Sequence, residues 1–254
     1  MKKNLLIALG DSWTYGHGAY DDVSLAKFQE HKSIGQLHED TRAYMRANSW
    51  PMQLAGLLDY QVINMGQGGS ANSTHAKWLI NSDRLDILNA REQYDNVVVI
   101  WLLSEPSRFS LYSSHKQAEA NILDIHTSAI LAGIIDRGPD VKKFAELYFQ
   151  LANYTDCIRD TMFHIKAVEN YCVANGYKFL FGNAFSPVSY DSPHNLHNGQ
   201  PYQTMGEFLA HDDYAALMSP VCCHPNTRGY RAIAGELRRI LLLGGLVWCY
   251  PATK

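Results

Sequence analysis

A serine that follows a short apolar run is the first residue of this chain whose setting favours chemistry. The run at 5–9 ends in Gly10-Asp11-Ser12, and apolar residues that stop at a glycine indicate a buried strand entering a tight turn. Ser12 would then lie at the carboxyl end of a parallel strand, where ligands bind in open α/β sheets. The N-terminus of the following helix favours developing negative charge there. A serine at this place can also serve only as a helix cap. Its chemistry would be nucleophilic attack, which needs a base within hydrogen-bond reach and donors for the oxyanion.

Three further segments could supply the donors and the base. Asn64 opens the glycine-rich stretch NMGQGGSAN at 64–72, and glycines allow a backbone N–H to approach a reacting oxygen closely. A phosphate-binding loop is the alternative, but the stretch lacks the Gly-Lys-Ser/Thr and G-x-G-x-x-G spacings. Ser104 follows the clearest apolar run, and His224 lies in a Cys-His-Pro-Asn turn before the last helical pattern. This position makes His224 the best candidate base among the 11 histidines.

Two other groups of chemically capable residues have weaker support. His194 and His197 fall in an irregular stretch, where contact with the substrate is the role to consider. Cys222, Cys223 and His224 lack a second Cys/His group at zinc-ligand spacing. We therefore expect no metal site and interpret the two cysteines as buried small apolar residues.

The segments GDSWTYG (10–16), NMGQGGSAN (64–72) and CHPNTRGYRAIA (223–234), in this order, resemble blocks I, II and V of the SGNH (GDSL-type) hydrolase family. The resemblance implies a serine esterase or deacetylase that needs no metal and no cofactor. It also implies a three-layer α/β/α sandwich with a mostly parallel, five-stranded flavodoxin-like sheet. Carried over position by position, Ser12 is the nucleophile and its own N–H contributes to the oxyanion hole. Gly69 matches the oxyanion-hole glycine, and His224 matches the catalytic base.

Two positions depart from the family pattern. The third block normally reads G-x-N-D, and Ser104 stands where its asparagine would complete the oxyanion hole. A hydroxyl donates one hydrogen bond over a shorter reach, and Asn72 could share the task. Val221 stands where the family has an aspartate, three residues before the histidine. Without a carboxylate His224 loses its orienting partner, and its pKa is then expected near or below the usual value of about 6.5.

Three outcomes for the missing aspartate remain open. Asp212 or Asp213 could replace it, a backbone carbonyl could orient the ring, or activity could be weak or lost. We favour a carbonyl or another non-acidic partner, because the two aspartates precede a predicted strand at 215–218 and could lie at its opposite end.

The elements that must position these residues alternate between strand and helix patterns. This alternation predicts a parallel sheet covered by helices on both faces. After the first strand, further strands are expected at 61–65, 96–103 and 177–182, with a fifth at 215–218 or 246–249. Helices are expected at about 51–58, 141–174 and 227–243. Two stretches, about 19–48 and 185–213, fit no element and are interpreted as substrate-shaping insertions in a single domain over 1–254.

The composition narrows the class of protein. With 254 residues, 46% of them hydrophobic, the chain can bury a sizeable core. A net charge of −3 gives no reason to expect nucleic acid or an anionic membrane as a partner. Asp11 interrupts the first apolar run where a signal-peptide cleavage site should follow, and no apolar run approaches the ~20 residues of a membrane helix. Five cysteines without a framework pattern suit a reducing compartment, so a cytoplasmic location, or another without a classical signal peptide, is expected.

Together these observations favour a metal-independent serine hydrolase that cleaves a carboxylic ester. An O-acetylated carbohydrate is the first substrate hypothesis, since 15 tyrosines and 5 tryptophans could line a sugar-binding groove, although aromatic residues usually fill cores. A lipid or another small ester is the alternative substrate. The alternative class is a non-catalytic binding module that keeps the fold, which Val221 and Ser104 would support. A flavodoxin-like nucleotide binder is disfavoured because the first turn lacks a hydroxyl-rich phosphate loop.

Overall fold

A parallel sheet of four strands forms the centre of the molecule, in the order β2-β1-β3-β6. The computed structural model describes residues 3–19, 39–81, 90–112, 122–125, 130, 138–211, 213–219, 222 and 224–243. The strands are β1 (Asn4–Gly10), β2 (Gln61–Asn64), β3 (Asn96–Leu103) and β6 (Lys178–Asn183). All three neighbouring pairs are parallel, so the four carboxyl ends meet at one edge of the sheet. The first four predicted strands are therefore confirmed.

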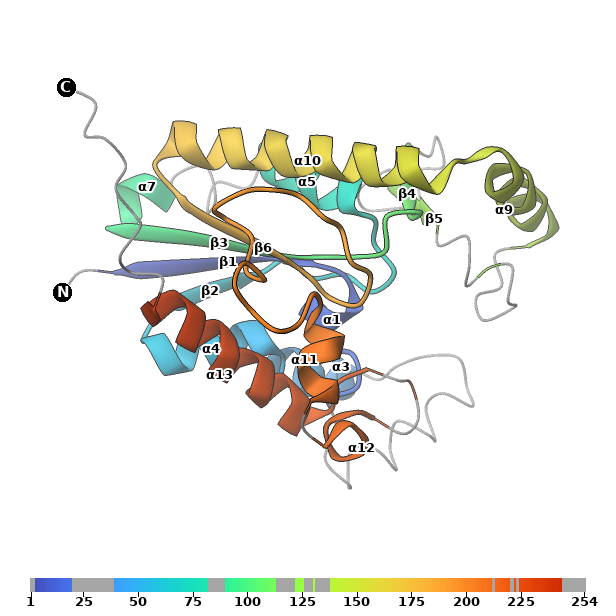
Figure 1. Ribbon diagram of the computed structural model, residues 1–254. Helices are drawn as coiled ribbons and strands as arrows, with labels where there is room; N and C mark the ends of the chain where they lie inside the picture. The colour runs from blue at the N-terminus through green and yellow to red at the C-terminus, as the bar shows by residue number, and fades with distance from the viewer. Residues whose placement is uncertain are drawn as a thin grey trace.

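Helices cover both faces of this sheet, which confirms the predicted α/β sandwich (Figure 1). On one face lie α5 (Asn72–Ile80) and α10 (Tyr154–Asn175), and on the other lie α4 (Trp50–Leu58) and α13 (Thr227–Leu243). Side chains of β1 alternate between the two faces, as in any strand. Leu6 packs in the core under α4 and α13, whereas Leu5 and Ile7 pack in the core under α5 and α10. Burial on both faces explains why the strands are almost continuously apolar.

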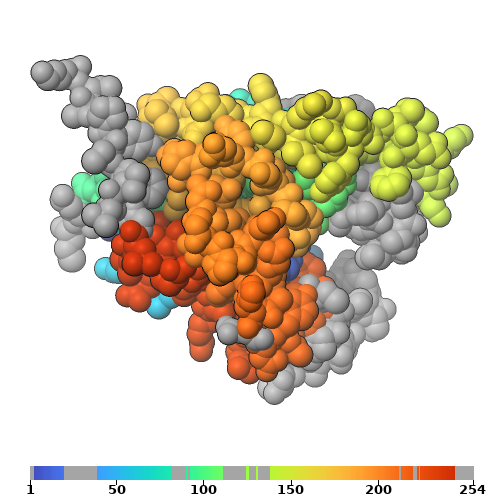
Figure 2. Space-filling view, in the orientation of Figure 1, coloured from blue at the N-terminus to red at the C-terminus, as the bar shows by residue number. Residues whose placement is uncertain are grey.

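The prediction of a fifth strand is wrong at 215–218 and falls outside the described residues at 246–249. Residues Tyr214–Leu217 form the short helix α12, because the Asp213 side chain accepts from the N–H of Ala216 and caps a run of helix-forming residues. The exposed edge of β6 is covered in another way. Phe181 donates to the carbonyl of His194 and accepts from the N–H of Leu196, so part of the irregular 185–213 stretch pairs with β6. Figure 2 shows this stretch between α10 and α13.

The single helical stretch expected at 141–174 is two helices, α9 (Pro139–Leu151) and α10. The break lies at Ala152 and Asn153, where the Asn153 side chain accepts from the N–H of Thr155 and starts α10. The helices expected near 51–58 and at 227–243 are confirmed as α4 and α13.

The other elements are short or were not predicted. They are α1 (Ser12–Tyr15), α3 (Glu39–Ala47), α7 (Ala90–Gln93), α11 (Met205–Ala210) and the antiparallel pair β4 (Phe109–Tyr112) and β5 (Ile122–Ile125). Much of the insertion expected at 19–48 lies outside the described residues. None of the described helices combines the length and the apolar character needed to cross a membrane.

Candidate active site

Ser12 is the first residue of α1, directly after β1 reaches the carboxyl edge of the sheet. The turn is held by Asp11, whose Oδ1 accepts from the N–H of Trp13 at 3.0 Å and whose carbonyl accepts from Thr14 and Tyr15. Asp11 is fully buried and Ser12 is 9% exposed. The predicted position of Ser12, at a strand end and a helix start, is therefore confirmed.

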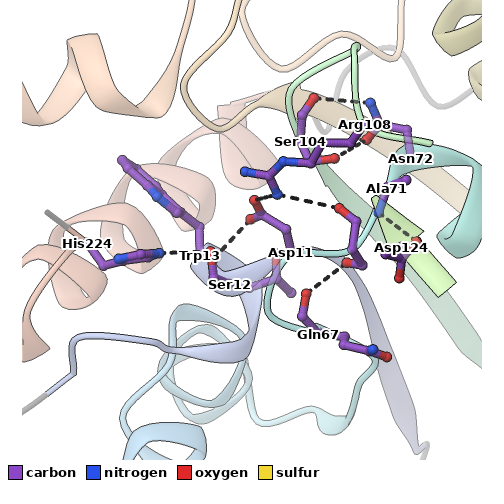
Figure 3. A network of polar contacts seen from close by, with 12 residues as sticks. Asp11, Ser12, Trp13, Gln67, Ala71, Asn72, Ser104, Arg108, Asp124 and His224 are labelled. Atoms are coloured by element: carbon purple, nitrogen blue, oxygen red, sulfur yellow. Dashed lines mark hydrogen bonds and ion pairs between the residues drawn. The ribbon is translucent and has the colours of Figure 1, made fainter. Parts of the chain in front are cut away.

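His224 lies against Ser12 although the two residues are 212 positions apart in the chain. Its Nε2 is 2.8 Å from Ser12 Oγ, and its Nδ1 is 2.7 Å from the carbonyl oxygen of Cys222. A carbonyl oxygen can only accept, so Nδ1 carries the proton and Nε2 is left to accept from the serine hydroxyl. Figure 3 shows the imidazole edge directed at Ser12. This is the tautomer that a general base needs.

Two contacts hold His224, which precedes α13, against the turn that follows β1. Gly18 has φ +95°, and a Cβ at this position would lie 2.8 Å from the Cβ of His224, so only glycine allows this approach. Tyr230 of α13 donates to the carbonyl of His17 at 2.8 Å. The His17 ring itself lies 4.9 Å from the His224 ring, centroid to centroid.

The pKa of His224 differs from the value expected for a histidine without a carboxylate partner. Burial lowers the pKa of His224, but hydrogen bonds to Cys222, the negative charge of its thiolate form and the Asp11 carboxylate outweigh burial and raise the pKa above its usual value. Burial raises the pKa of the Cys222 thiol, but hydrogen bonds with His224 and Ser219 lower it below its ordinary value. The expectation of a pKa near or below 6.5 is therefore wrong. The interpretation of Cys222 as a buried apolar residue is also wrong, since it is partly exposed and contacts His224.

Asp213 is not the partner of His224. Its carboxylate accepts from the N–H of Ala216 at 3.3 Å and caps α12, while Cys222 occupies Nδ1 of His224. The partner of Nδ1 is therefore a backbone carbonyl, that of Cys222, as we favoured. Asp212 and Val221 lie outside the described residues.

Gly68 and Gly69, in the glycine-rich loop after β2, face open space. Gly69 has φ +77°, a backbone conformation that favours glycine, and a Cβ added there would meet no atom within 4 Å. Within the described part of the chain, no protein acceptor bonds the N–H of Gly69 or of Ser12. Ser70 holds the loop in place. Its Oγ donates to the Gln67 carbonyl at 2.8 Å and lies 2.6 Å from Nε2 of the buried His75.

Ser104 and Asn72 are close together, but they bond to each other. The Ser104 N–H and hydroxyl both donate to Asn72 Oδ1, at 2.9 and 3.1 Å. The Asn72 amide donates to the Ser104 carbonyl at 3.1 Å and reaches Thr161 Oγ1 at 3.5 Å. Ser104 is fully buried and Asn72 is 2% exposed. The hydrogen-bonding groups of both side chains are thus used within the protein.

The other candidate histidines have structural partners. His197 Nε2 accepts from the N–H of Asn183 at 2.8 Å, and His194 Nε2 lies 3.4 Å from Glu169 Oε1. Both therefore hold the 185–213 stretch against β6 and α10. Among the described residues, no group of three or more His, Cys, Asp or Glu could hold a metal ion. Cys223 lies outside them.

Two residues near the site were not predicted from the sequence. Arg108 forms a buried ion pair with Asp11, with Nη1 2.6 Å from Oδ2 (Figure 3). Asp124 of β5 accepts from the N–H of Ala71 at 3.2 Å and from the Thr74 hydroxyl, and so connects β5 to the start of α5. Neither residue belongs to a sequence motif. Only the fold brings them to the carboxyl edge.

No protein-family profile and no curated protein sequence matches the chain. Solved structures do show likeness. A protein of the G-D-S-L family from Desulfitobacterium hafniense DCB-2, described as lipolytic, is 13% identical, with 93% of this chain and 99% of that chain covered and a TM-score of 0.47. The esterase EstA from a Pseudoalteromonas species is 12% identical, with 95% and 98% covered and a TM-score of 0.47. An acetyl xylan esterase from Butyrivibrio proteoclasticus is 13% identical, with 94% and 63% covered and a TM-score of 0.40.

Proposed function

We propose that this protein is a serine hydrolase that cleaves a carboxylic ester through an acyl-serine intermediate. The observation that carries the proposal is the 2.8 Å contact between Ser12 Oγ and the unprotonated Nε2 of His224. A nucleophile in contact with a base, and a base whose other nitrogen is held in place, is the arrangement that activates a hydroxyl. The N–H groups of Ser12 and Gly69 supply donors for the oxyanion.

The proposed reaction uses these groups in two similar halves. His224 Nε2 takes the proton of Ser12 Oγ while Oγ bonds to the ester carbonyl carbon, and the carbonyl oxygen becomes an oxyanion. When the oxyanion collapses, the bond to the alcohol breaks and Nε2 returns the proton to the leaving oxygen. A water molecule then attacks the acyl group in the same way, and Ser12 is restored. The Cys222 carbonyl and the Asp11 carboxylate stabilise the imidazolium that forms in each half.

For the substrate we keep an acetylated carbohydrate as the first hypothesis and a lipid or small ester as the second. The support from aromatic residues is weaker than the composition suggested. Of the four described tryptophans, Trp13, Trp50 and Trp101 are buried in the core. A panel of acetylated oligosaccharides, together with aryl esters of increasing acyl length, would rank the two substrate classes.

Ser12→Ala tests the proposed function. It should abolish hydrolysis of an aryl acetate, with a loss in kcat on the order of 10⁴- to 10⁶-fold, because the nucleophile is removed. A fluorophosphonate should add one adduct to the wild-type protein, located at Ser12 by mass spectrometry, and none to the variant. The control is Ser73→Ala, which changes another serine outside the Ser12–His224 pair.

A purified Ser12→Ala protein within about tenfold of wild-type activity would overturn the assignment. A wild-type protein that neither hydrolyses esters nor reacts with the fluorophosphonate would instead support the non-catalytic binding module.

A further inference from the structure

A buried arginine at the site has more hydrogen-bond donors than the protein uses. Arg108 is 8% exposed, and its Nη1 donates to Asp11 Oδ2 at 2.6 Å and reaches the Ser70 carbonyl at 3.5 Å. Nε is buried without a partner, and within the described part of the chain the bonds of the guanidinium all come from Nη1. A guanidinium has five N–H donors. Nη2, unlike Nε, is not among the buried atoms without a partner, so its N–H groups can take an acceptor from solvent or a ligand.

The guanidinium lies where the segments after all four strands meet. It contacts Asp11 after β1 and Ser70 after β2, its own chain follows β3, and its Cζ lies 5.2 Å from the ring centre of Phe185 after β6. Figure 3 shows it above Asp11, on the same edge as Ser12. Asp11 connects the guanidinium to the turn that holds Ser12, because its Oδ2 accepts from Arg108 and its Oδ1 accepts from the N–H of Trp13.

The side chain expected to complete the oxyanion hole is not available for that task. The Ser104 hydroxyl and N–H both donate to Asn72, and the Asn72 amide donates back to Ser104. A reacting oxygen would have to break this buried pair to reach either side chain.

Building on the proposed function, we propose that the guanidinium of Arg108 is the third donor to the oxyanion, in the place that Ser104 was expected to fill. The group donates a hydrogen bond as negative charge develops on the carbonyl oxygen, and it stays protonated throughout. Because the donor is a cation, this bond is stronger than one from a neutral side chain. In the resting enzyme the Asp11 carboxylate balances the charge. Arg108 would then be a catalytic residue that touches the reacting atoms.

The alternative is that Arg108 acts only by holding Asp11, and a set of variants separates the two roles. Arg108→Met should lower kcat on an aryl acetate by about 10- to 10³-fold with little change in KM, as for loss of an oxyanion-hole donor. Affinity for an aryl trifluoromethyl ketone, which forms a tetrahedral oxyanion on the serine, should fall by a similar factor. Arg108→Lys should recover part of both losses, because lysine keeps the charge without the planar fork. Arg159→Met, at an exposed ion pair on α10, is the matched control.

A double-mutant cycle decides between direct action and action through Asp11. Asp11→Asn removes the ion pair but keeps a side-chain oxygen that can accept from the N–H of Trp13. If Arg108 reaches the substrate, Arg108→Met lowers kcat further in the Asp11→Asn background; if it only holds Asp11, no further loss occurs and the proposal fails. Thermal unfolding checks each variant, and Arg108→Lys takes the place of Arg108→Met should the latter not fold.

Two results would overturn this inference while leaving the proposed function intact. One is wild-type kcat and inhibitor affinity in folded Arg108→Met. The other is a 10- to 10³-fold loss in Ser104→Ala, with Arg108→Met unaffected, which would return the role to Ser104. Absence of Ser12-dependent hydrolysis in the wild-type protein would instead remove the proposed function and this inference together.

Discussion

His224 has different partners on its two ring nitrogens, and these partners bear on its proposed role as a base. The Cys222 carbonyl fixes the proton on Nδ1, and Ser12 Oγ contacts Nε2. The Cys222 side chain adds a second effect, because its hydrogen bond and charge help to raise the pKa of His224 above its usual value. Under the proposed function the Cys222 side chain would therefore perform part of the task that an aspartate performs in a serine triad.

This arrangement predicts the pH dependence of the reaction. A base must be neutral to act, so kcat/KM should fall as the pH drops through a value above about 6.5, the ordinary pKa of histidine. Cys222→Ala removes the thiol but keeps the carbonyl, and should move this acidic limb to lower pH. The pH profile of kcat/KM measures the shift, and Cys157→Ala, a buried cysteine on α10, should leave the limb in place. A limb that stays unchanged in Cys222→Ala would show that the thiol does not tune the base.

At the residue scale, the sequence was informative where a residue type is tied to a local backbone pattern. Ser12 ends an apolar run at a glycine, Gly69 lies in a glycine-rich loop and His224 lies in a turn, and all three lie where these patterns predicted. Arg108 gave no such signal, because an isolated arginine is usually solvated. Its burial depends on a partner 97 positions away in the chain, Asp11.

Among the elements, α12 shows how a short apolar stretch can be misread. The residues Ala215 to Met218 fit a strand by apolar character alone, and short runs do not separate strand from helix. Asp213 favours the helix, because its side chain accepts from the N–H of Ala216 at the start of α12. The break between α9 and α10 has a similar cause. Within a continuous helical pattern, the Asn153 side chain accepts from the N–H of Thr155 and so starts α10.

The capping role of Asp213 gives a prediction that differs from that of a catalytic acid. Asparagine caps helices about as well as aspartate, so Asp213→Asn should fold normally and keep kcat within about threefold of wild type. Loss of a triad carboxylate would instead cost about 10⁴-fold. Asp213→Ala should lose the cap and about 0.5–2 kcal/mol of stability. A large fall in kcat of a well-folded Asp213→Asn protein, measured beside unfolding curves, would contradict the assignment of Asp213 as a cap.

For the molecule as a whole, two buried histidines make stability depend on pH. Burial lowers the pKa of His75 to about 3, and burial lowers that of His197 to about 4. In the unfolded chain both have a pKa near 6.5, so between these values the unfolded state binds more protons than the folded state. Their contribution is fully present above about pH 6.5 and is lost as the pH falls toward about 4 for His197 and about 3 for His75.

Unfolding by urea at several pH values tests this dependence. Each buried histidine should cost about 1.4 kcal/mol per pH unit below about 6.5. His75→Asn should be less stable than wild type at pH 7 but lose stability less steeply on acidification, by about that amount per unit. His211→Asn, at an exposed position, should follow the wild-type slope. Parallel curves for His75→Asn and wild type would show that His75 does not titrate in this way.

At the same scale, the layered architecture was predictable from alternating strand and helix patterns, whereas the number of strands was not. The edge of β6 is protected by Phe181 pairing with His194 and Leu196. The chain that does so is rich in proline, asparagine and glycine and carries no strand pattern. Such an edge depends on where the loop packs and not on its composition.

The distance along the chain between Ser12 and His224 also has a consequence for synthesis. The 212 positions that separate them, translated at about 5–20 residues per second, take roughly 10–40 s. During that interval the newly made Ser12 lacks His224, its proposed base. Its hydroxyl therefore remains an ordinary alcohol, without the base that would activate it under the proposed function. If Ser12 is the proposed nucleophile, it meets its base only after α13 has been made and Gly18 has allowed the His224 ring to approach.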